Sequence, residues 1–516
     1  MYNTADRKRQ KKLSWLDAII ALVLGTIIIG GILVVAQTIW SGYHFLDDHE
    51  LISIENSAKN GAGLFTYVKT SIVNDMQRRY RPLYWIERVT VCYLLGSNLT
   101  TWNIWTAIKG ILAFALLYET ARYLKFGRVI STLFPMIMML GEQFMPWYRS
   151  ANQESTGVLL CAGAMCLIAA QNYYRRYKSK AYNIAITVLV ILSGLVKESF
   201  TLFMLLLPAL KIWLEYWDGC DETWIGADRK GRLLSLIREN WWTYALILLA
   251  TLSNVYMITF RVGVDQISYA GFHADTAIGE YIEGIGESLF QNMKWYTVAA
   301  LVWVFMMVLC YQLVEKYNIR KYLSLCLLLL CTMGIQLVAH AKSGMWGRYM
   351  FPYMIAYTLL FILLGYRIFG KDRLRGTIYL IVAILLLGQS GITAARQARD
   401  YAKDGNWIGE YFQCILDHTT DEDRIVSAFV DGELDGATEW WLETHGRDQV
   451  YSNIDGEWNN MVQINGELNG DCSWDDVKIV TFYSFAENYT LSLMGDAAWT
   501  DYDVYKFGNY AVMVKR

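Results

Sequence analysis

Residues 15–40 read WLDAIIALVLGTIIIGGILVVAQTIW, and the chain continues SGYHFLDDHE over residues 41–50. The first stretch exceeds the roughly 20 apolar residues that a helix needs to cross a bilayer, and its one acid, Asp17, lies near its start. A cleaved signal peptide has a shorter apolar region that ends in small residues. Residues 15–40 therefore predict an uncleaved membrane span, and the basic residues 7–12 place its N-terminus in the cytoplasm.

The composition is that of a membrane protein. Apolar residues make up 54% of the chain and charged residues only 18%, a balance far from that of a soluble domain. The 20 Trp and 35 Tyr residues are frequent beside the ends of apolar runs, as in the aromatic belts of membrane proteins. The net charge is −2 and basic residues cluster only beside apolar runs, so nucleic-acid binding has no support.

Further apolar runs predict further spans. Together with residues 15–40 they make about eleven, with boundaries loose by several residues. The runs lie near residues 102–122, 129–146, 155–172, 182–197, 199–215, 241–260, 295–313, 322–340, 352–369 and 375–394.

Basic clusters mark alternate loops between these spans. They fall on the side of the N-terminus, as the positive-inside rule requires of cytoplasmic loops. An odd number of spans then places the C-terminus outside. The clusters are Arg122/Lys125/Arg128, 175–180, Arg229/Lys230/Arg232, Lys316/Arg320/Lys321 and Lys371/Arg373/Arg375.

The first outer loop, residues 41–98, is predicted to carry helices that lie flat on the membrane surface. Leu51, Ile54 and Ala58 share one helical face, and Pro82 suits the first turn of a second helix. The predicted organisation is thus a cytoplasmic segment 1–14, a helical transmembrane bundle 15–394 and an outer domain that follows it.

Residues 396–516 are acidic and polar, unlike the preceding bundle. Strand-like runs at 424–430, 477–483 and 510–514 alternate with helix-like stretches at 436–443 and 486–493. This alternation predicts a small α/β domain, which the topology places outside the cytoplasm.

Most of the nine cysteines lie in apolar runs and are interpreted as small buried residues. No Cys/His spacing indicates a metal site. Cys414 and Cys472 share the polar C-terminal region and can pair only if that region is extracytoplasmic, which the sequence leaves open.

Asp47 and Asp48, with His44, His49 and Glu50, form a cluster of acids and imidazoles directly after the first span. Neighbouring residues on a helix point about 100° apart, so the two aspartates cannot face one target together. One can take a proton from a substrate hydroxyl while the other orients it. Crowding of like charges raises the pKa of at least one of them, which suits a general base. The alternative is a capping box that begins a surface helix.

Cations also gather on the predicted outer face, where the positive-inside rule does not account for them. As a set they indicate an anion site, and a phosphate at the membrane surface is the obvious anion. For each cation alone the alternative is a side chain that snorkels to the interface. The set comprises Arg78, Arg79, Arg81, Arg149, Lys197, Arg261, Lys342 and Arg348.

Three further residues leave two interpretations open. Lys197-Glu198, at a predicted outer turn, can form an ion pair or present Lys197 to a phosphate. Glu154 can complete an acceptor or sugar site, or it can simply begin the next helix with a favourable dipole interaction.

Taken in chain order, Asp47-Asp48, Lys197-Glu198 and Arg348-Tyr349-Met-Phe-Pro352 resemble the GT-C superfamily of integral-membrane glycosyltransferases. This superfamily includes the protein O-mannosyltransferases and the aminoarabinose transferases. The resemblance covers roughly residues 15–394. The commoner acidic pair of the family is Asp-Glu, so the identity of the base within Asp47-Asp48 is open, with Asp47 favoured.

The resemblance implies inverting transfer of a sugar from a polyprenyl-phosphate donor to an extracytoplasmic hydroxyl of a glycan, lipid or protein, at a bacterial plasma membrane. It implies a general base from Asp47 or Asp48 and requires no cofactor and no metal. The proton acceptor and the cations are expected to meet in one outer pocket. The implied donor-phosphate residues are Arg348, Lys197, Arg78, Arg79 and Arg81, and the implied acceptor or sugar residues are Glu154, Arg149, His49 and Tyr349.

Two other functions remain open. A transporter or flippase for an amphipathic anion would also need buried cations, although such proteins typically show broken helices in two related halves. A non-catalytic membrane scaffold with an outer binding domain would make Asp47 and Asp48 dispensable.

Overall fold

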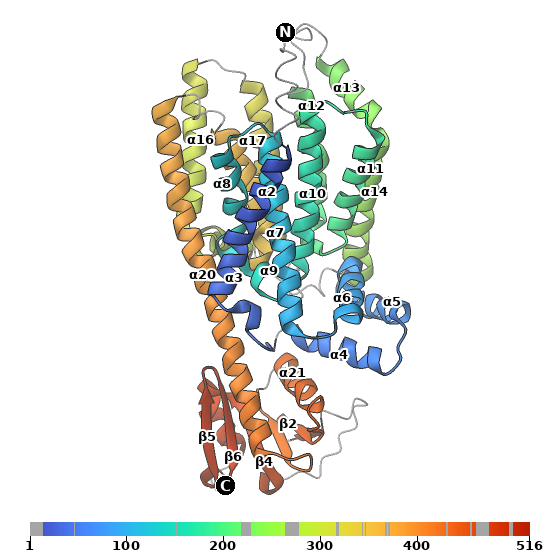
Figure 1. Cartoon of the computed structure of the whole chain (residues 1–516), viewed down its shortest axis with the longest axis vertical. Coiled ribbons are helices and arrows are strands. Elements are labelled where there is room, and N and C mark those ends of the chain that lie inside the picture. The colour runs from blue at the N-terminus through green and yellow to red at the C-terminus, as the bar shows by residue number, and fades with distance from the viewer. Residues whose placement is uncertain are drawn as a thin grey trace. The chain divides into compact units, whose positions relative to one another are not determined.

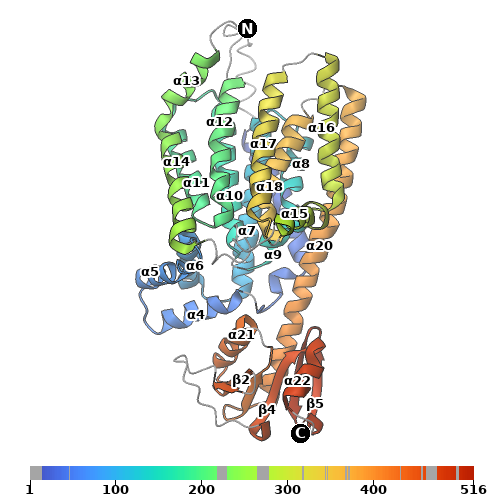
Figure 2. The same cartoon turned by 180° about the vertical axis from the view of Figure 1, so that it is seen from behind.

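The computed structural model shows a mainly helical chain with one β-sheet (Figures 1 and 2). It describes residues 14–45, 47–150, 152–217, 229–263, 278–315, 319–342, 344–345, 347–366, 369, 372–429, 432–454, 457–460, 474–494 and 499–516.

The chain divides into two compact units. The helical unit comprises Met1–Val35, Val68–Glu87 and Trp105–Gln397. The C-terminal unit comprises Ala398–Arg516 and two earlier segments, Ala36–Tyr67 and Arg88–Ile104. Both earlier segments overlap the predicted first outer loop, residues 41–98.

Long helices separated by short turns make up most of the described chain. The N-terminal apolar segment forms α2 (Ser14–Gly25), η1 (Thr26–Gly30) and α3 (Gly31–Val35). The other principal helices are α4 (Asp48–Lys59), α5 (Leu64–Asp75), α6 (Pro82–Leu95), α7 (Leu99–Tyr123), α8 (Arg128–Met139), α9 (Met145–Tyr148), α10 (Gln153–Tyr173), α11 (Lys180–Gly194), α12 (Leu206–Trp217), α13 (Arg229–Glu239), α14 (Trp241–Tyr256), α15 (Ile278–Glu287), α16 (Trp295–Glu315), α17 (Ile319–Ala339), α18 (Phe351–Thr358) and α20 (Arg373–His418).

Seven helices within the described residues are long and apolar enough to cross a membrane. An eighth crossing results if α8 and the segment Glu142–Tyr148, which bend by 83° at their junction, act as one span. Three predicted spans coincide with shorter apolar helices, at Lys180–Gly194, Trp295–Met306 and Gly347–Leu363. The chain is therefore a helical membrane protein.

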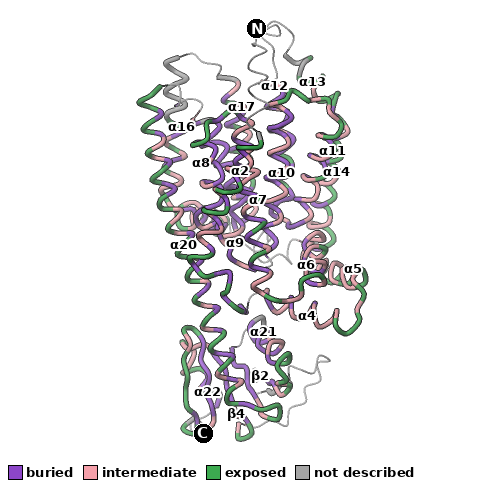
Figure 3. Tube along the Cα trace, in the orientation of Figure 1, coloured by how far each residue is buried: buried purple, intermediate pink, exposed green. Residues whose placement is uncertain are grey.

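The helices of the helical unit differ in how much of their surface is covered. Most of α10 is buried, whereas α14 is largely exposed (Figure 3). Leu248, Leu249 and Leu252 of α14 are 48%, 64% and 57% exposed. An exposed helix face made mainly of leucines suits contact with lipid.

The C-terminal unit contains a six-stranded mixed sheet with the order β3-β2-β1-β4-β6-β5. Strand β1 pairs in parallel with β2 and β4, and the remaining neighbours are antiparallel. The strands are β1 (Arg424–Ser427), β2 (Val450–Ile454), β3 (Glu457–Asn460), β4 (Val477–Tyr483), β5 (Tyr502–Phe507) and β6 (Tyr510–Lys515). The predicted α/β domain is thus present, with two helices near the predicted positions: α21 (Gly432–Glu443) and α22 (Glu487–Met494).

Alternating residues of these strands enter two separate cores, because successive side chains of a strand point to opposite faces of the sheet. Ile425 and Ile479 pack with residues of α20 and α21 on one face. Val426 and Val480 pack with Met494 of α22 on the other, and α22 lies beside β4 in Figure 2. Helices therefore cover both faces of the sheet.

Glu439 of α21 gives this unit an expected pH dependence. Burial, with a smaller contribution from Glu443, raises the pKa of Glu439 to about 8. The folded protein thus holds this proton more tightly than the unfolded chain. The resulting contribution to the free energy of unfolding is complete below about pH 4.5 and is lost as the pH rises towards 8.

Glu439→Gln is accordingly expected to match the wild-type stability at pH 4.5 and to exceed it at pH 8, by at most about 1.4 kcal/mol for each pH unit. Thermal unfolding of both proteins at the two pH values measures the effect. Parallel pH profiles for Glu439→Gln and the wild type would contradict it, and Glu422→Gln, which changes an exposed carboxylate elsewhere in the C-terminal unit, is the control.

Candidate functional site

Asp47 occupies the residue just before α4 with a left-handed backbone, φ 72° and ψ −20°. Non-glycine residues adopt this conformation rarely, although Asp does so more readily than most. Its side chain makes no capping hydrogen bond to the helix, so the structure does not contain the capping box considered from the sequence. A strained position whose carboxylate is not used by the helix is typical of functional residues.

Asp48 lies in a different environment from Asp47. Its side chain is 1% exposed and its Oδ2 accepts a hydrogen bond from the backbone N–H of His44 at 3.0 Å. This contact closes the turn between His44 and the start of α4. Asp48 is therefore suited to holding the turn, whereas Asp47, which is only partly buried, is the better placed of the two for contact with a substrate.

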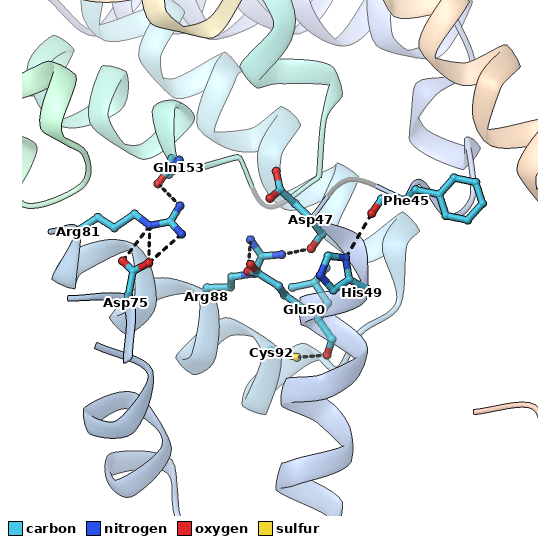
Figure 4. Close-up of polar contacts among 10 residues, drawn as sticks. Phe45, Asp47, His49, Glu50, Asp75, Arg81, Arg88, Cys92 and Gln153 are labelled. Carbon is cyan, nitrogen blue, oxygen red and sulfur yellow. Dashed lines mark hydrogen bonds and ion pairs between the residues drawn. The ribbon is translucent and has the colours of Figure 1, made fainter. Parts of the chain in front are cut away.

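Arg88 of α6 fixes the backbone on the other side of Asp47. Its guanidinium donates to the Asp47 carbonyl oxygen and lies 3.2 Å from the Glu50 carboxylate, while the Asp47 carboxylate points away from it (Figure 4). Arg88 is only 2% exposed. Arg88 was not predicted from the sequence, where its one signal is a basic residue within the largely apolar run that begins at Pro82.

His49, predicted to contact the sugar or acceptor, lies one turn further along. Its Nδ1 is 3.3 Å from the Phe45 carbonyl oxygen, as Figure 4 shows. Its ring meets the edge of Trp440 of α21 at a centroid distance of 5.6 Å. The ring contact joins the first turn of α4 to α21 within the C-terminal unit.

In the helical unit, the structure brings together four of the predicted residues. Glu154 lies in the first turn of α10, Lys197 precedes the short helix Glu198–Phe200, and Arg348 and Tyr349 lie in the short helix Gly347–Met350. The Lys197 ammonium pairs with Oε1 of Glu154, and Nε of Arg348 is 3.7 Å from the same oxygen. We call these residues the Glu154 cluster.

Burial and charge distinguish the Glu154 cluster from an ordinary surface ion pair. Glu154 and Lys197 are completely buried, whereas Arg348 retains 19% of its side-chain exposure. Two cations share the Glu154 carboxylate, and the carboxylate of Glu198 also interacts electrostatically with Lys197. A partly exposed guanidinium beside a buried ammonium is suited to binding an anion such as a phosphate.

Tyr349 places an aromatic face beside both cations. Its ring centroid is 4.3 Å from the Lys197 ammonium nitrogen and 5.4 Å from Cζ of Arg348, within the range of cation–π interactions. The buried ring of His340 stacks on Tyr349 at 5.5 Å. His340 was not predicted from the sequence, because it lies at the end of an apolar run and belongs to no recognisable motif.

Arg81 is held by other partners of the helical unit. Its guanidinium makes a bidentate contact with Asp75, at 2.9 Å and 3.0 Å, and donates to the side chain of Gln153 at 3.0 Å (Figure 4). Gln153 directly precedes Glu154, so Arg81 reaches the same end of α10. Because Asp75 neutralises it, Arg81 is a weaker candidate for a phosphate ligand than Arg348.

The other predicted cations lie in turns. Arg78 is exposed and Arg79 half-buried after α5, and Arg149 is half-buried after α9. Cys414 is a free, half-buried thiol, and Cys472, its proposed partner, lies outside the described residues.

An open apolar groove of about 620 Å³ lies between α16 and α20 in the helical unit. Ligand pockets generally fall in this size range. Three aromatic side chains and Gln389 line the groove together with five aliphatic side chains, and this mainly apolar wall suits a hydrocarbon chain. The lining residues are Trp295, Tyr296, Ala299, Ala300, Trp303, Val382, Leu385, Leu386 and Gln389.

No protein-family model and no curated protein matches the chain. Among the residues that the structure describes, no group of three or more His, Cys, Asp or Glu side chains is arranged to hold a metal ion.

Proposed function

We propose that this membrane protein is a glycosyltransferase that moves a sugar from a polyprenyl-phosphate donor to a hydroxyl group on the extracytoplasmic side. The observation that carries the proposal is the Glu154 cluster, in which a buried lysine and a partly exposed arginine share one carboxylate. Cations among apolar helices are costly and often line a polar cavity or bind an anion, and a lipid phosphate is such an anion. The resemblance to the GT-C superfamily supports the same substrate class.

The proposed reaction is a displacement at the anomeric carbon with inversion. The Asp47 carboxylate accepts the proton of the acceptor hydroxyl while the hydroxyl oxygen forms a bond to the anomeric carbon. The bond between that carbon and the phosphate oxygen breaks, and the phosphate leaves with the electron pair. Arg348 and Lys197 stabilise the leaving phosphate, so no general acid is required on that side.

The lipid portion of the donor is assigned to the apolar groove between α16 and α20. Its mainly apolar wall matches a polyprenyl chain, and its openness permits a chain much longer than the groove to continue into the bilayer. In the same proposal, Arg78 and Arg79 bind the donor phosphate, and Arg149 and His49 contact the acceptor or the sugar.

The proposed topology has about eleven crossings, with the N-terminus in the cytoplasm and residues 396–516 outside. Three short apolar helices and the bent pair would supply the crossings beyond the seven long helices. In this orientation Asp47 lies on the outer side. The basic clusters lie in the cytoplasmic loops, as the positive-inside rule requires.

Purified protein in lipid nanodiscs tests the function. Undecaprenyl-phosphate glucose, galactose and mannose, each with a labelled sugar, are supplied with envelope glycolipids and proteins as acceptors. We expect release of undecaprenyl phosphate and a labelled product from at least one donor. Movement of the donor across liposome membranes without any sugar transfer would overturn the proposal in favour of a lipid transporter.

A further inference from the structure

The core of the C-terminal unit includes two residues that lie far away in the sequence, Tyr43 and Phe45. Both belong to the cluster formed by α20, α21 and one face of the sheet, and Phe45 is 3% exposed. They immediately precede the turn that carries Asp47. The domain that begins near residue 398 is therefore built around the segment leading to the proposed base.

Phe45 is surrounded by aromatic rings from several elements of the unit. Its ring centroid lies 5.1 Å from Tyr510 of β6, 5.7 Å from Phe412 of α20 and 5.9 Å from Phe429, which follows β1. Ring pairs at these distances are favourable beyond their buried area. The adjacent Tyr43 donates its hydroxyl to the Ala437 carbonyl oxygen of α21 at 3.0 Å.

His44, between these two anchors, is held against α20. Its ring stacks on Tyr401 at a centroid distance of 3.6 Å, and its Nδ1 is 3.7 Å from Asp404. The Tyr510 hydroxyl donates to the same Asp404 carboxylate at 3.2 Å. The backbone N–H of His44 is the group that Asp48 binds, so the side chain and the main chain of this residue connect the domain to the turn.

Gly405 of α20 shows how closely the segment approaches the helix. A Cβ atom at this position would collide with the carbonyl oxygen of Ser41 and with the ring of His44. Any larger residue must displace the 41–45 segment or the helix. Gly405 thus allows the segment to pass against α20 without a gap.

We propose that the C-terminal domain acts as a positioning device for the proposed base, with Phe45 and His44 as positioning residues that transmit the domain's rigidity to Asp47. This inference rests on the proposed function for its catalytic consequence. Its structural half, that the domain core fixes the turn at residues 43–50, stands on the contacts alone. General-base catalysis is sensitive to such placement, and a shift of about 1 Å can cost roughly 10²-fold in rate.

Phe45→Ala in the full-length protein tests the proposal, with Phe482→Ala as the matched control. Phe482 is a completely buried phenylalanine of the same sheet, but it belongs to the core on the opposite face. Both variants lose one buried ring, so both are expected to lower the Tm by similar amounts. Only Phe45→Ala is expected to lower kcat, roughly 10²-fold, with the donor KM unchanged and with faster hydrogen exchange at residues 47–50.

Gly405→Ala and Phe45→Leu extend the test. Gly405→Ala keeps every core aromatic yet displaces the segment, so it is expected to reproduce the loss of kcat and of exchange protection. Phe45→Leu keeps most of the buried volume and is expected to restore much of both. Equal kcat losses in Phe45→Ala and Phe482→Ala, or unchanged exchange in Phe45→Ala, would overturn the proposal. Wild-type protein without transferase activity, combined with the expected exchange changes, would reject the glycosyltransferase assignment and retain the positioning role.

Discussion

Asp47→Asn is expected to lower kcat for sugar transfer by about 10²–10⁴-fold, the usual contribution of a general base. Asn is nearly the same size as Asp but cannot accept the acceptor's proton. Donor binding depends on the phosphate and the lipid chain, so the dissociation constant for undecaprenyl phosphate should stay within about twofold of the wild type. Single-turnover transfer and lipid binding, measured on the same preparation, separate the two effects.

The control for this prediction is Asp48→Asn. The amide oxygen of Asn can still accept the His44 N–H bond that Asp48 makes, so the turn should persist and most activity should remain. If Asp48→Asn loses as much activity as Asp47→Asn, holding the turn does not account for the effect of Asp48. The assignment of Asp47 alone as the base would then be wrong. Unaltered transfer in both variants removes the general base from the mechanism.

Lys197→Met is expected to destabilise the protein by about 3–5 kcal/mol, because it leaves the buried Glu154 carboxylate without its main counter-charge. The double variant Glu154→Gln/Lys197→Met removes both completely buried charges and should recover most of that loss. Neither variant should bind undecaprenyl phosphate normally, because the ammonium is absent from both. Denaturant unfolding in detergent gives the stability, and binding in nanodiscs gives the affinity.

Lys211 offers a matched control within the helical unit. It forms a second buried ion pair, with Glu215 on the same helix, and both side chains are at most 2% exposed. Lys211→Met should therefore destabilise the protein to a similar degree while leaving lipid binding intact. A loss of lipid binding in Lys211→Met equal to that in Lys197→Met would show that binding follows general stability, which contradicts an anion site at the Glu154 cluster.

The elements that could be predicted from the sequence are those with a strong local signal. The first span follows from an apolar run uninterrupted beyond Asp17, and α6 begins at Pro82 as its fixed φ angle suggests. Strands β1, β4 and β6 have β-branched, alternating residues and lie where they were predicted. Strand β5, at the sheet edge, was missed because its residues are mostly exposed and two of them are charged.

Other features depend on contacts that no local pattern reveals. The predicted span at 375–394 is part of a helix that runs to His418, although Gly405 and Gly409 within it disfavour a helix. The attachment of Tyr43 and Phe45 to the C-terminal core joins residues hundreds of positions apart. The members of the Glu154 cluster were each predicted as candidate site residues from the sequence. That Lys197 and Arg348 share the Glu154 carboxylate could not be predicted.

The most direct test of the central claim is an experimental structure of the protein with an undecaprenyl-phosphate sugar bound in nanodiscs, using Asp47→Asn to prevent turnover. The proposed mechanism predicts the phosphate within about 3 Å of Arg348 and Lys197, the lipid chain in the groove between α16 and α20, and the anomeric carbon facing residue 47. A phosphate bound away from the Glu154 cluster, or residue 47 facing bulk water with the donor in place, would contradict it.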